Sequence, residues 1–139
     1  MDMFNLKCIA LLVLMLQLTT MSAQELTEFK WKKRILLLLD TKNDLHTRNL
    51  QLNKFDGRYN EMTERDLVLL VYNGMEVLDK DGMITNINPE NVTYGDFQGI
   101  LLIGKDGDVK LRKKYIVEAN EIFDLIDQMP MRRSEMKNR

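Results

Sequence analysis

The sequence predicts an α/β protein of three layers, in which a mixed four-stranded sheet has helices on both faces. Residues 35–39 and 67–72 are continuous apolar runs, which are typical of strands buried on both faces of a sheet. The segment between them has apolar residues at helical spacing, so the three elements predict a right-handed parallel strand–helix–strand unit. Two later strands and a final helix complete the domain. The expected strand order is 2-1-3-4, with the third strand antiparallel.

Length and charge limit the classes of function. The chain has 139 residues, enough for one domain, and its formal net charge is -1 at pH 7. A nearly balanced charge gives no field that favours nucleic acid, so we expect none among the partners. The sequence also has no glycine-rich phosphate loop and no serine nucleophile motif, and we expect no cofactor.

Residues 1–23 are organised like a secretory signal peptide. A short first segment carries Lys7, an apolar run covers residues 8–16, and polar and small residues follow as far as Ala23. The run is short for a membrane span, which takes roughly 20 apolar residues. We expect cleavage after Ser22 or Ala23; the alternatives are an uncleaved anchor and a buried N-terminal helix. The prediction is an exported protein, periplasmic or secreted, with no stable membrane span after cleavage.

The cysteine content excludes thiol chemistry for the mature chain. Cys8 is the only cysteine, and it lies in the apolar run of the predicted signal peptide. After cleavage the chain has none, although an exported protein enters a compartment that permits disulfides. Thiol–disulfide exchange and thiol peroxidase activity both need a thiolate. The mature chain is therefore predicted to carry out neither reaction.

The first helix is predicted to follow the first strand directly. Residues 24–34 form a lead into that strand, and Asn43 or Asp44 is the expected N-cap, because either side chain accepts a hydrogen bond from first-turn amides. Gly57 weakens the helix near its end. Apolar residues on one face of this helix recur at Leu45, Leu52, Phe55 and Tyr59.

The middle of the chain predicts a hairpin and a short helix. Residues 75–78 and 83–87 flank the sequence DKDG, which favours a tight turn between two short strands. Asn88 and Pro89 have the pattern of an N-cap followed by the first helical residue. Gly95 is expected to end that helix.

The last third of the chain predicts a β-hairpin and a helix. The third strand is expected at residues 100–103, and the fourth at 109–112, where apolar and basic residues alternate. Pro130 is expected to end the last helix. The polar residues 131–139 are expected to form a tail that frays, so that residues 35–130 form the folded domain. The apolar face of the last helix consists of Ala119, Ile122, Phe123, Ile126 and Met129.

The order of these elements is that of a thioredoxin-like fold, and two motifs suggest a family. The sequences LLIGKDGDVKLR (101–112) and EIFDLIDQMPMRR (121–133) resemble a domain of unknown function in the thioredoxin-like clan. That domain occurs alone in exported bacterial proteins. It is also similar to the peroxiredoxin-like domain of vertebrate sushi-repeat and matrix-associated secreted proteins. The resemblance covers about residues 26–136 and implies a fold and an exported location, but no reaction.

The chain departs from active thioredoxins at the positions that carry their chemistry. The resemblance places the first reactive cysteine near Asp44 and the second near Thr47, and the cis-proline position near Gly99. His46 is the only histidine, and it lies in the same turn as Asp44 and Asp40. A histidine with two carboxylates supports acid–base catalysis. The simpler interpretation is a solvated residue in the first turn of a helix, and a transition-metal site lacks a second histidine or a cysteine.

Cations near the two family motifs suggest an anion-binding surface. Lys110 and Arg112 lie on the fourth strand beside Lys113 and Lys114, and other cations follow the last helix. They could bind a phosphate, a sugar acid or an anionic headgroup; the alternative is an ordinary solvated surface. A calcium loop around Asp79 lacks the acidic ligands at its first and last positions, and a hairpin turn explains it better. The predicted ligand-binding residues are Lys105, Lys110, Arg112, Arg132 and Arg133.

These observations favour a redox-inactive module that binds a protein or an anionic ligand outside the cytoplasm. The alternative is an unrecognised enzyme that uses acid–base groups in the turn after the first strand. An enzyme predicts a concave pocket that holds His46 beside a carboxylate with a shifted pKa. A binding module predicts a filled or flat turn, and a contiguous exposed patch elsewhere.

Overall fold

The computed structural model describes residues 25–92 and 94–139, together with residues 2, 3, 5, 7 and 9. The predicted signal peptide is therefore almost wholly outside the described residues, as are Cys8 and both predicted cleavage positions. Within the part of the chain that is described, no helix is long and apolar enough to cross a membrane.

The sheet confirms the predicted strand order and adds one short strand. Its order is β3-β2-β1-β4-β5, with β1 parallel to β2 and antiparallel to β4. Strand β3 has only two residues and lies in the first arm of the hairpin predicted at residues 75–78 and 83–87. It pairs with the end of β2, and Leu78 also forms an isolated bridge with Ile84 of the second arm. The strands are β1 (Arg34–Leu39), β2 (Leu67–Tyr72), β3 (Val77–Leu78), β4 (Gly99–Ile103) and β5 (Val109–Lys113).

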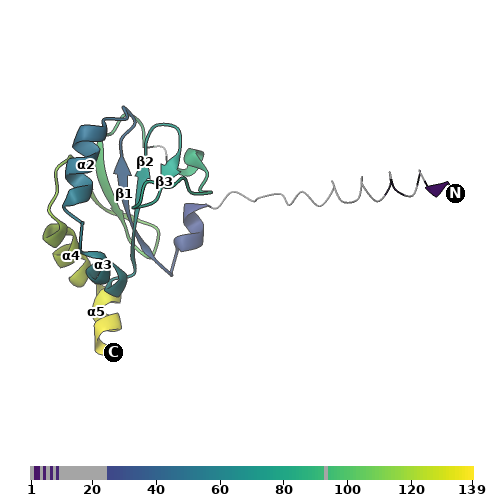
Figure 1. The fold of residues 1–139 in the computed structure, drawn as a ribbon. Helices are drawn as coiled ribbons and strands as arrows, with labels where there is room; N and C mark the ends of the chain where they lie inside the picture. The colour runs from purple at the N-terminus through teal and green to yellow at the C-terminus, as the bar shows by residue number, and fades with distance from the viewer. Residues whose placement is uncertain (1, 4, 6, 8, 10–24, 93) are drawn as a thin grey trace.

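Helices cover one face of the sheet, whereas short 3-10 helices and loops cover the other. Figure 1 shows the α-helices together on one side of the sheet, with η1 on the other side. The second layer is therefore thinner than the predicted helical layer. The α-helices are α2 (Leu45–Asn53), α3 (Tyr59–Glu64), α4 (Ala119–Asp127) and α5 (Pro130–Lys137), and the 3-10 helices are η1 (Leu26–Phe29) and η2 (Pro89–Val92).

Alternation along β1 divides the core into two clusters. Leu36 and Leu38 are fully buried against the helical face, where they join Phe123 of α4. Ile35 and Leu37 point to the opposite face and join residues of the loop layer. Since every residue of β1 is buried, this strand is the centre of both clusters, as its continuous apolar run predicts.

The predicted first helix is divided into two, and its buried face differs from the prediction. Helix α2 ends at Asn53 and α3 begins at Tyr59, with Gly57 between them at a φ of 70°. Leu45 and Tyr59 are more than half exposed. The other two predicted residues, Leu52 and Phe55, do pack in the core. The buried residues of α2 itself are Arg48 and Gln51, two polar side chains that find hydrogen-bond partners inside the protein.

The C-terminal segment is a helix, where the sequence predicted a frayed tail. Pro130 ends the predicted helix, but it also occupies the first turn of α5, a position that tolerates its missing N–H. Arg132 in α5 is only 1% exposed. The helix is polar, so charged contacts rather than an apolar face hold it in place. These contacts are described below.

Gly99 occupies the position that we compared with the cis-proline of thioredoxins, and the structure shows why no side chain fits there. It is the first residue of β4 and has a φ of 155°. A Cβ atom at this position would overlap the Lys113 carbonyl oxygen of β5 and lie 2.8 Å from Phe97 Cζ. Close approach of the neighbouring backbone therefore requires glycine.

We predict that Gly99→Ala lowers the free energy of unfolding by about 1–3 kcal/mol, because backbone atoms must move to admit the methyl group. Urea unfolding followed by circular dichroism measures the change. Gly104→Ala is the matched control: its Cβ meets the ends of the Lys110 and Asp106 side chains, which can rotate away. Equal losses in the two variants would show that the backbone contact at Gly99 is unimportant.

Candidate functional site

The turn after β1 encloses a buried carboxylate that is fully engaged. Asp40 follows the strand directly and is 1% exposed. Its Oδ1 atom accepts a hydrogen bond from the Asp44 amide at 2.8 Å, and its Oδ2 atom accepts one from Arg48 Nη1 at 3.1 Å. The same Arg48 nitrogen donates to Asn43 Oδ1 at 3.2 Å. The Arg48 guanidinium thus neutralises Asp40 and ties α2 to the end of β1.

Asp44 is a helix cap, as predicted. Its carboxylate accepts a hydrogen bond from the Thr47 amide at 3.2 Å and another from Thr47 Oγ1 at 2.7 Å. These two bonds from Thr47 hold the pKa of Asp44 below its usual value. His46, the next candidate, is exposed on the first turn of α2. His46 makes a smaller contribution to the lowering of the Asp44 pKa, so these two residues lie side by side at the surface. The Asp40 carboxylate is instead buried against Arg48.

Two further polar side chains fill the interior beneath this turn, and sequence analysis missed both. Gln51 is fully buried; its Nε2 donates to the Val117 carbonyl and its Oε1 accepts from the Val117 amide, both at 2.8 Å. The Tyr115 hydroxyl donates to the Leu39 carbonyl at 2.8 Å. Burial, and then the Asp40 charge, raise the pKa of Tyr115 above its usual value. The sequence signal for the buried Gln51 was its position three residues after Arg48, on the same side of the helix. Such spacing does not reveal that a polar side chain is buried.

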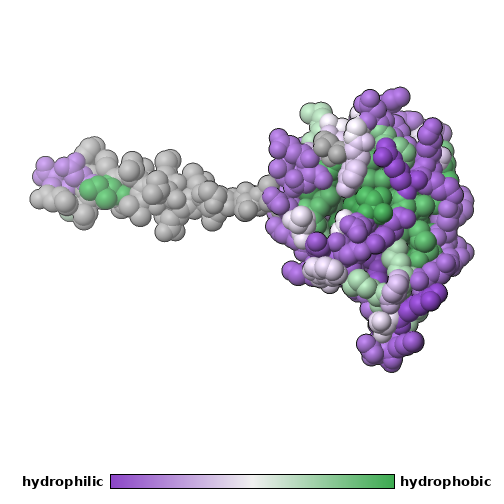
Figure 2. Space-filling view, turned by 180° about the vertical axis from the view of Figure 1, so that it is seen from behind, coloured by the Kyte–Doolittle hydropathy of each residue, from purple (hydrophilic) through white to green (hydrophobic). Residues whose placement is uncertain are grey.

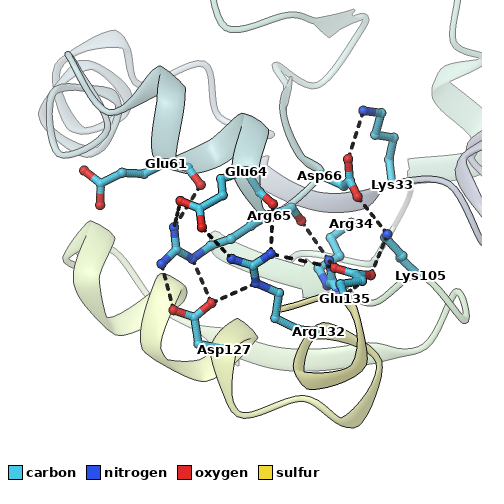
Figure 3. A network of polar contacts seen from close by, with 10 residues as sticks. All are labelled: Lys33, Arg34, Glu61, Glu64, Arg65, Asp66, Lys105, Asp127, Arg132 and Glu135. Carbon is cyan, nitrogen blue, oxygen red and sulfur yellow. Dashed lines mark hydrogen bonds and ion pairs between the residues drawn. The ribbon is translucent and has the colours of Figure 1, made fainter. Parts of the chain in front are cut away.

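Two of the predicted anion-binding cations belong instead to an internal charge network at the opposite end of β1 (Figure 3). Arg132 Nε donates to Asp127 Oδ1 at 3.1 Å, and its Nη2 donates to Glu64 Oε1 at 3.1 Å. Lys105 is 9% exposed, and its ammonium lies 2.8 Å from Asp66 Oδ2. Both cations are already neutralised, so the expectation that they bind an external anion does not fit their surroundings.

Arg34 connects this network to β1. It is 1% exposed, and two of its nitrogens donate to the two carboxylate oxygens of Glu135, each at 3.2 Å. Lys105 also lies 2.6 Å from Glu135, so this carboxylate of α5 joins two cations. Arg34 Nη1 donates to the Arg65 carbonyl at 2.8 Å. The Nε of Arg34 has no hydrogen-bond partner among the described residues.

The carboxylates of the network titrate below their usual range. Burial opposes the ionisation of Glu135, but hydrogen bonds from Lys105 and Arg34 outweigh it and lower the pKa of Glu135. The pKa of Asp127 is lowered in the same way, against its burial, by Arg65 and Arg132. These charges therefore stabilise the folded state while they are ionised.

The other predicted cations do not form one surface. Lys110 pairs with Asp106 at 2.6 Å, and the Arg112 guanidinium lies 4.2 Å from the centre of the Phe97 ring. Lys113 points to the opposite face of β5, because neighbouring strand residues alternate, and its ammonium is 2.5 Å from Glu121 of α4. Arg133 is exposed on α5. Of the five predicted residues, only Lys110 and Arg112 are exposed on one strand, and a register shift in the β4–β5 pairing leaves Lys110 without a partner residue between them.

Two hollows lie away from the turn after β1. One of about 350 Å³ is bounded by η1, the β4–β5 turn and the segment around Tyr94. The other, of about 290 Å³, lies along β2 between α3 and the turn at residues 79–81. Neither is lined by Asp40, Asp44 or His46. The Asp79 side chain itself accepts the Asp81 and Met83 amides, which is the hairpin turn that the sequence predicted.

Comparisons with known proteins agree with this architecture. The sequence model of a family described as a domain of unknown function, DUF4174, matches residues 25–135. A solved structure of reduced 2-Cys peroxiredoxin from Plasmodium vivax is similar, with a TM-score of 0.52 and 20% sequence identity. The similarity covers 78% of this chain and 84% of that chain, and at this identity it shows the thioredoxin-like fold alone. No curated protein matches the sequence.

We predict that Asp40→Asn and Arg48→Met each lower the free energy of unfolding by about 3 kcal/mol, because each leaves a buried partner unpaired. The double variant should lose less than the sum of the single losses, since neither charge then remains. Urea unfolding followed by circular dichroism gives all three values. Additive losses would show that the two side chains are not coupled.

We also predict that the protein is destabilised by acid. The network carboxylates have folded-state pKa values below the ordinary 3.8 of Asp and 4.5 of Glu, so their contribution is present above those values and is lost as pH falls through the folded pKa values. Urea unfolding at a series of pH values between 7 and about 2.5 should show the fall. Glu135→Gln should make this loss of stability at low pH smaller. An unchanged pH dependence in that variant would contradict the role given to the Glu135 carboxylate.

Proposed function

Because the chain belongs to the DUF4174 family of unknown function, we propose its function from its own geometry: an exported, redox-inactive module that binds a protein or an anionic ligand. Export rests on the signal-peptide pattern of residues 1–23. Redox inactivity rests on the absence of any cysteine after Cys8 in the sequence. Peroxidase chemistry needs a thiolate, so similarity to a peroxiredoxin supports a shared shape and no shared reaction.

One observation carries the non-catalytic part of the proposal: the turn after β1 is occupied by protein. The Arg48 guanidinium lies 3.1 Å from Asp40, in the turn where active thioredoxins hold their reactive groups. Both side chains are buried, with 9% and 2% of their surface exposed. An acid–base enzyme needs a carboxylate that can exchange a proton with substrate. A carboxylate held by an arginine and a backbone amide serves structure instead.

The anionic ligand is proposed for the exposed face of β5. Arg112 lies over Phe97 and, among the described residues, makes no ion pair with a carboxylate. A guanidinium stacked on a ring retains in-plane N–H groups for a phosphate or a carboxylate. Seen from behind, the molecule also has hydrophobic surface in the middle of its face, surrounded by hydrophilic side chains (Figure 2). Such a border around apolar surface is typical of interaction sites.

We predict that inorganic phosphate, sulfate or a sugar acid raises the melting temperature of the purified protein. An anion at about 100 times its dissociation constant adds roughly 2.7 kcal/mol of stability, which corresponds to several degrees in a domain of this size. Arg112→Ala should abolish the shift. Arg133→Ala is the matched control, because it removes the same charge from an exposed position on α5.

Three results would contradict this assignment. Equal loss in both arginine variants would indicate a general charge effect instead of a site. A melting shift with a divalent metal that disappears in His46→Ala would favour the acid–base alternative. No shift with any anion would exclude the anionic ligand and leave protein binding as the function.

A further inference from the structure

The turn between η1 and β1 presents the only tryptophan of the sequence to solvent. Trp31 is 63% exposed, although tryptophan is on average a highly buried residue. Its φ of 66° lies in the left-handed region, which is unfavourable for a bulky side chain. The Trp31 amide donates to the Lys105 carbonyl at 2.6 Å. The chain just after β4 therefore holds this turn in place, with the indole ring outside the core.

Two lysines beside the indole ring are not neutralised. Lys30 and Lys32 flank Trp31 in the sequence, and both are exposed. The Lys30 ammonium lies 5.6 Å from the centre of the Trp31 ring, and neither lysine has an ion pair with any described residue. They differ in this from Lys33, which pairs with Asp66 at 3.5 Å. Two ammonium groups thus remain available next to an exposed aromatic ring.

Helix α5 lies at the same end of the molecule as this turn (Figure 1). Lys105 joins the two, because its carbonyl accepts the Trp31 amide and its ammonium lies 2.6 Å from Glu135 of α5. Arg133 and Lys137 of α5 are exposed, and their spacing of four residues makes them neighbours on the helix. Neither cation has a carboxylate partner in the described part of the chain.

The same end of the molecule exposes apolar side chains and projects outward. Met131 of α5 is 39% exposed and Met136 is 42% exposed. Neither Trp31 nor these methionines line the hollows near η1 and β2, so the surface is not a pocket for a small molecule. We call this surface the basic end, and it consists of Lys30, Trp31, Lys32, Met131, Arg133, Met136 and Lys137.

Acidic side chains near the basic end reduce its charge on one side only. Asp66 and Glu135 each contact two cations and are neutralised. Three carboxylates without a cation partner among the described residues lie at η1 and the β4–β5 turn, and they are those of Glu25, Glu28 and Asp108. Two of them line the hollow near η1 together with Lys30. The attraction for an anion therefore rests on Lys32 and the two cations of α5.

This combination of side chains suits the surface of an anionic bilayer. Tryptophan is enriched where lipid headgroups meet water, because its ring is apolar and its N–H is polar. Lysines and arginines beside anionic lipids each strengthen binding. Nucleic acid also offers anions and faces that stack on an aromatic ring. The exposed Met131 and Met136 favour the bilayer, because they gain there from apolar contact.

We propose that the basic end binds the surface of a bilayer that contains anionic lipids, with Trp31 at the level of the headgroups. Lys32, Arg133 and Lys137 then lie against lipid phosphates. No described helix can cross a membrane, so the contact is peripheral. The surface is separate from the anion site proposed on β5, and it adds a location to the proposed binding role.

The fluorescence of Trp31 tests this directly, because the sequence has no other tryptophan. The purified full chain is titrated with vesicles of phosphatidylcholine, either alone or mixed with phosphatidylglycerol. The mixed vesicles should shift the emission to shorter wavelengths, as the ring leaves water, and phosphatidylcholine alone should not. Sedimentation with the mixed vesicles gives the partition constant, which should fall as salt is added.

Single variants identify the surface. Lys32→Ala and Lys137→Ala should each lower the partition constant by about fivefold, the usual effect of one cation near an anionic bilayer. Lys42→Ala is the matched control, because Lys42 is an equally exposed lysine in the turn at the opposite end of β1. Trp31→Ala should also weaken binding, and should leave the circular dichroism spectrum unchanged because the ring is exposed.

Three results would overturn the inference. Equal losses in Lys42→Ala and Lys32→Ala would show that net charge, and not this surface, determines binding. Equal binding to phosphatidylcholine alone would indicate an apolar contact, for example through residues 8–16. A Trp31 shift with dextran sulfate or oligothymidine, but none with vesicles, would assign the surface to a soluble polyanion.

One further variant separates this inference from the proposed function. Arg112→Ala removes the anion site proposed on β5 and should leave vesicle binding unchanged, whereas an equal loss in this variant would overturn the assignment to the basic end. If vesicles fail to bind while phosphate still raises the melting temperature through Arg112, the bilayer inference falls and the proposed function stands.

Discussion

Two buried charges, one at each end of β1, determine how the rest of the domain is arranged. Arg34 begins the strand and Asp40 follows it, and each is 1% exposed. A buried ion is costly unless an opposite charge and hydrogen bonds compensate it. Arg34 is compensated by Glu135 of α5, and Asp40 by Arg48 of α2. The strand between them is wholly apolar, so the first helix and the last helix are positioned by the ends of the same strand.

The parts of the fold that depend on local pattern were predictable from the sequence. Continuous apolar runs indicated β1, β2 and β4, and the thioredoxin-like order of the elements indicated the strand order. The hairpin around DKDG was also predictable, but its first arm, β3, is too short to show from sequence that it joins the edge of the sheet. Helix α5 was predicted to be a tail because its residues are polar. The contact that holds it joins Glu135 to Arg34, which is 101 positions away in the sequence. A contact over that distance has no signature in the local composition.

The candidate site shows the same limit. Sequence analysis selected Lys105 and Arg132 because they lie in the family motifs, and the structure gives those motifs a physical role. Lys105 of the first motif binds Glu135, and Asp127 and Arg132 of the second motif bind each other. An anion site and an internal ion-pair network use the same residue types, and only burial separates them. Arg48 and Gln51 were missed because polar residues on a helix are ordinarily solvated.

The pairing of the first strand with the last helix has a consequence for biosynthesis. Until residue 135 has left the ribosome, Arg34 lacks the carboxylate that makes its burial tolerable, and the central strand cannot settle into its final place. Contacts this distant along the chain also form slowly, since a long loop must close first. We therefore expect the central strand to reach its final place only after the last helix has been synthesised. Such a delay would suit the export that we propose, because an exported chain crosses its channel before it folds.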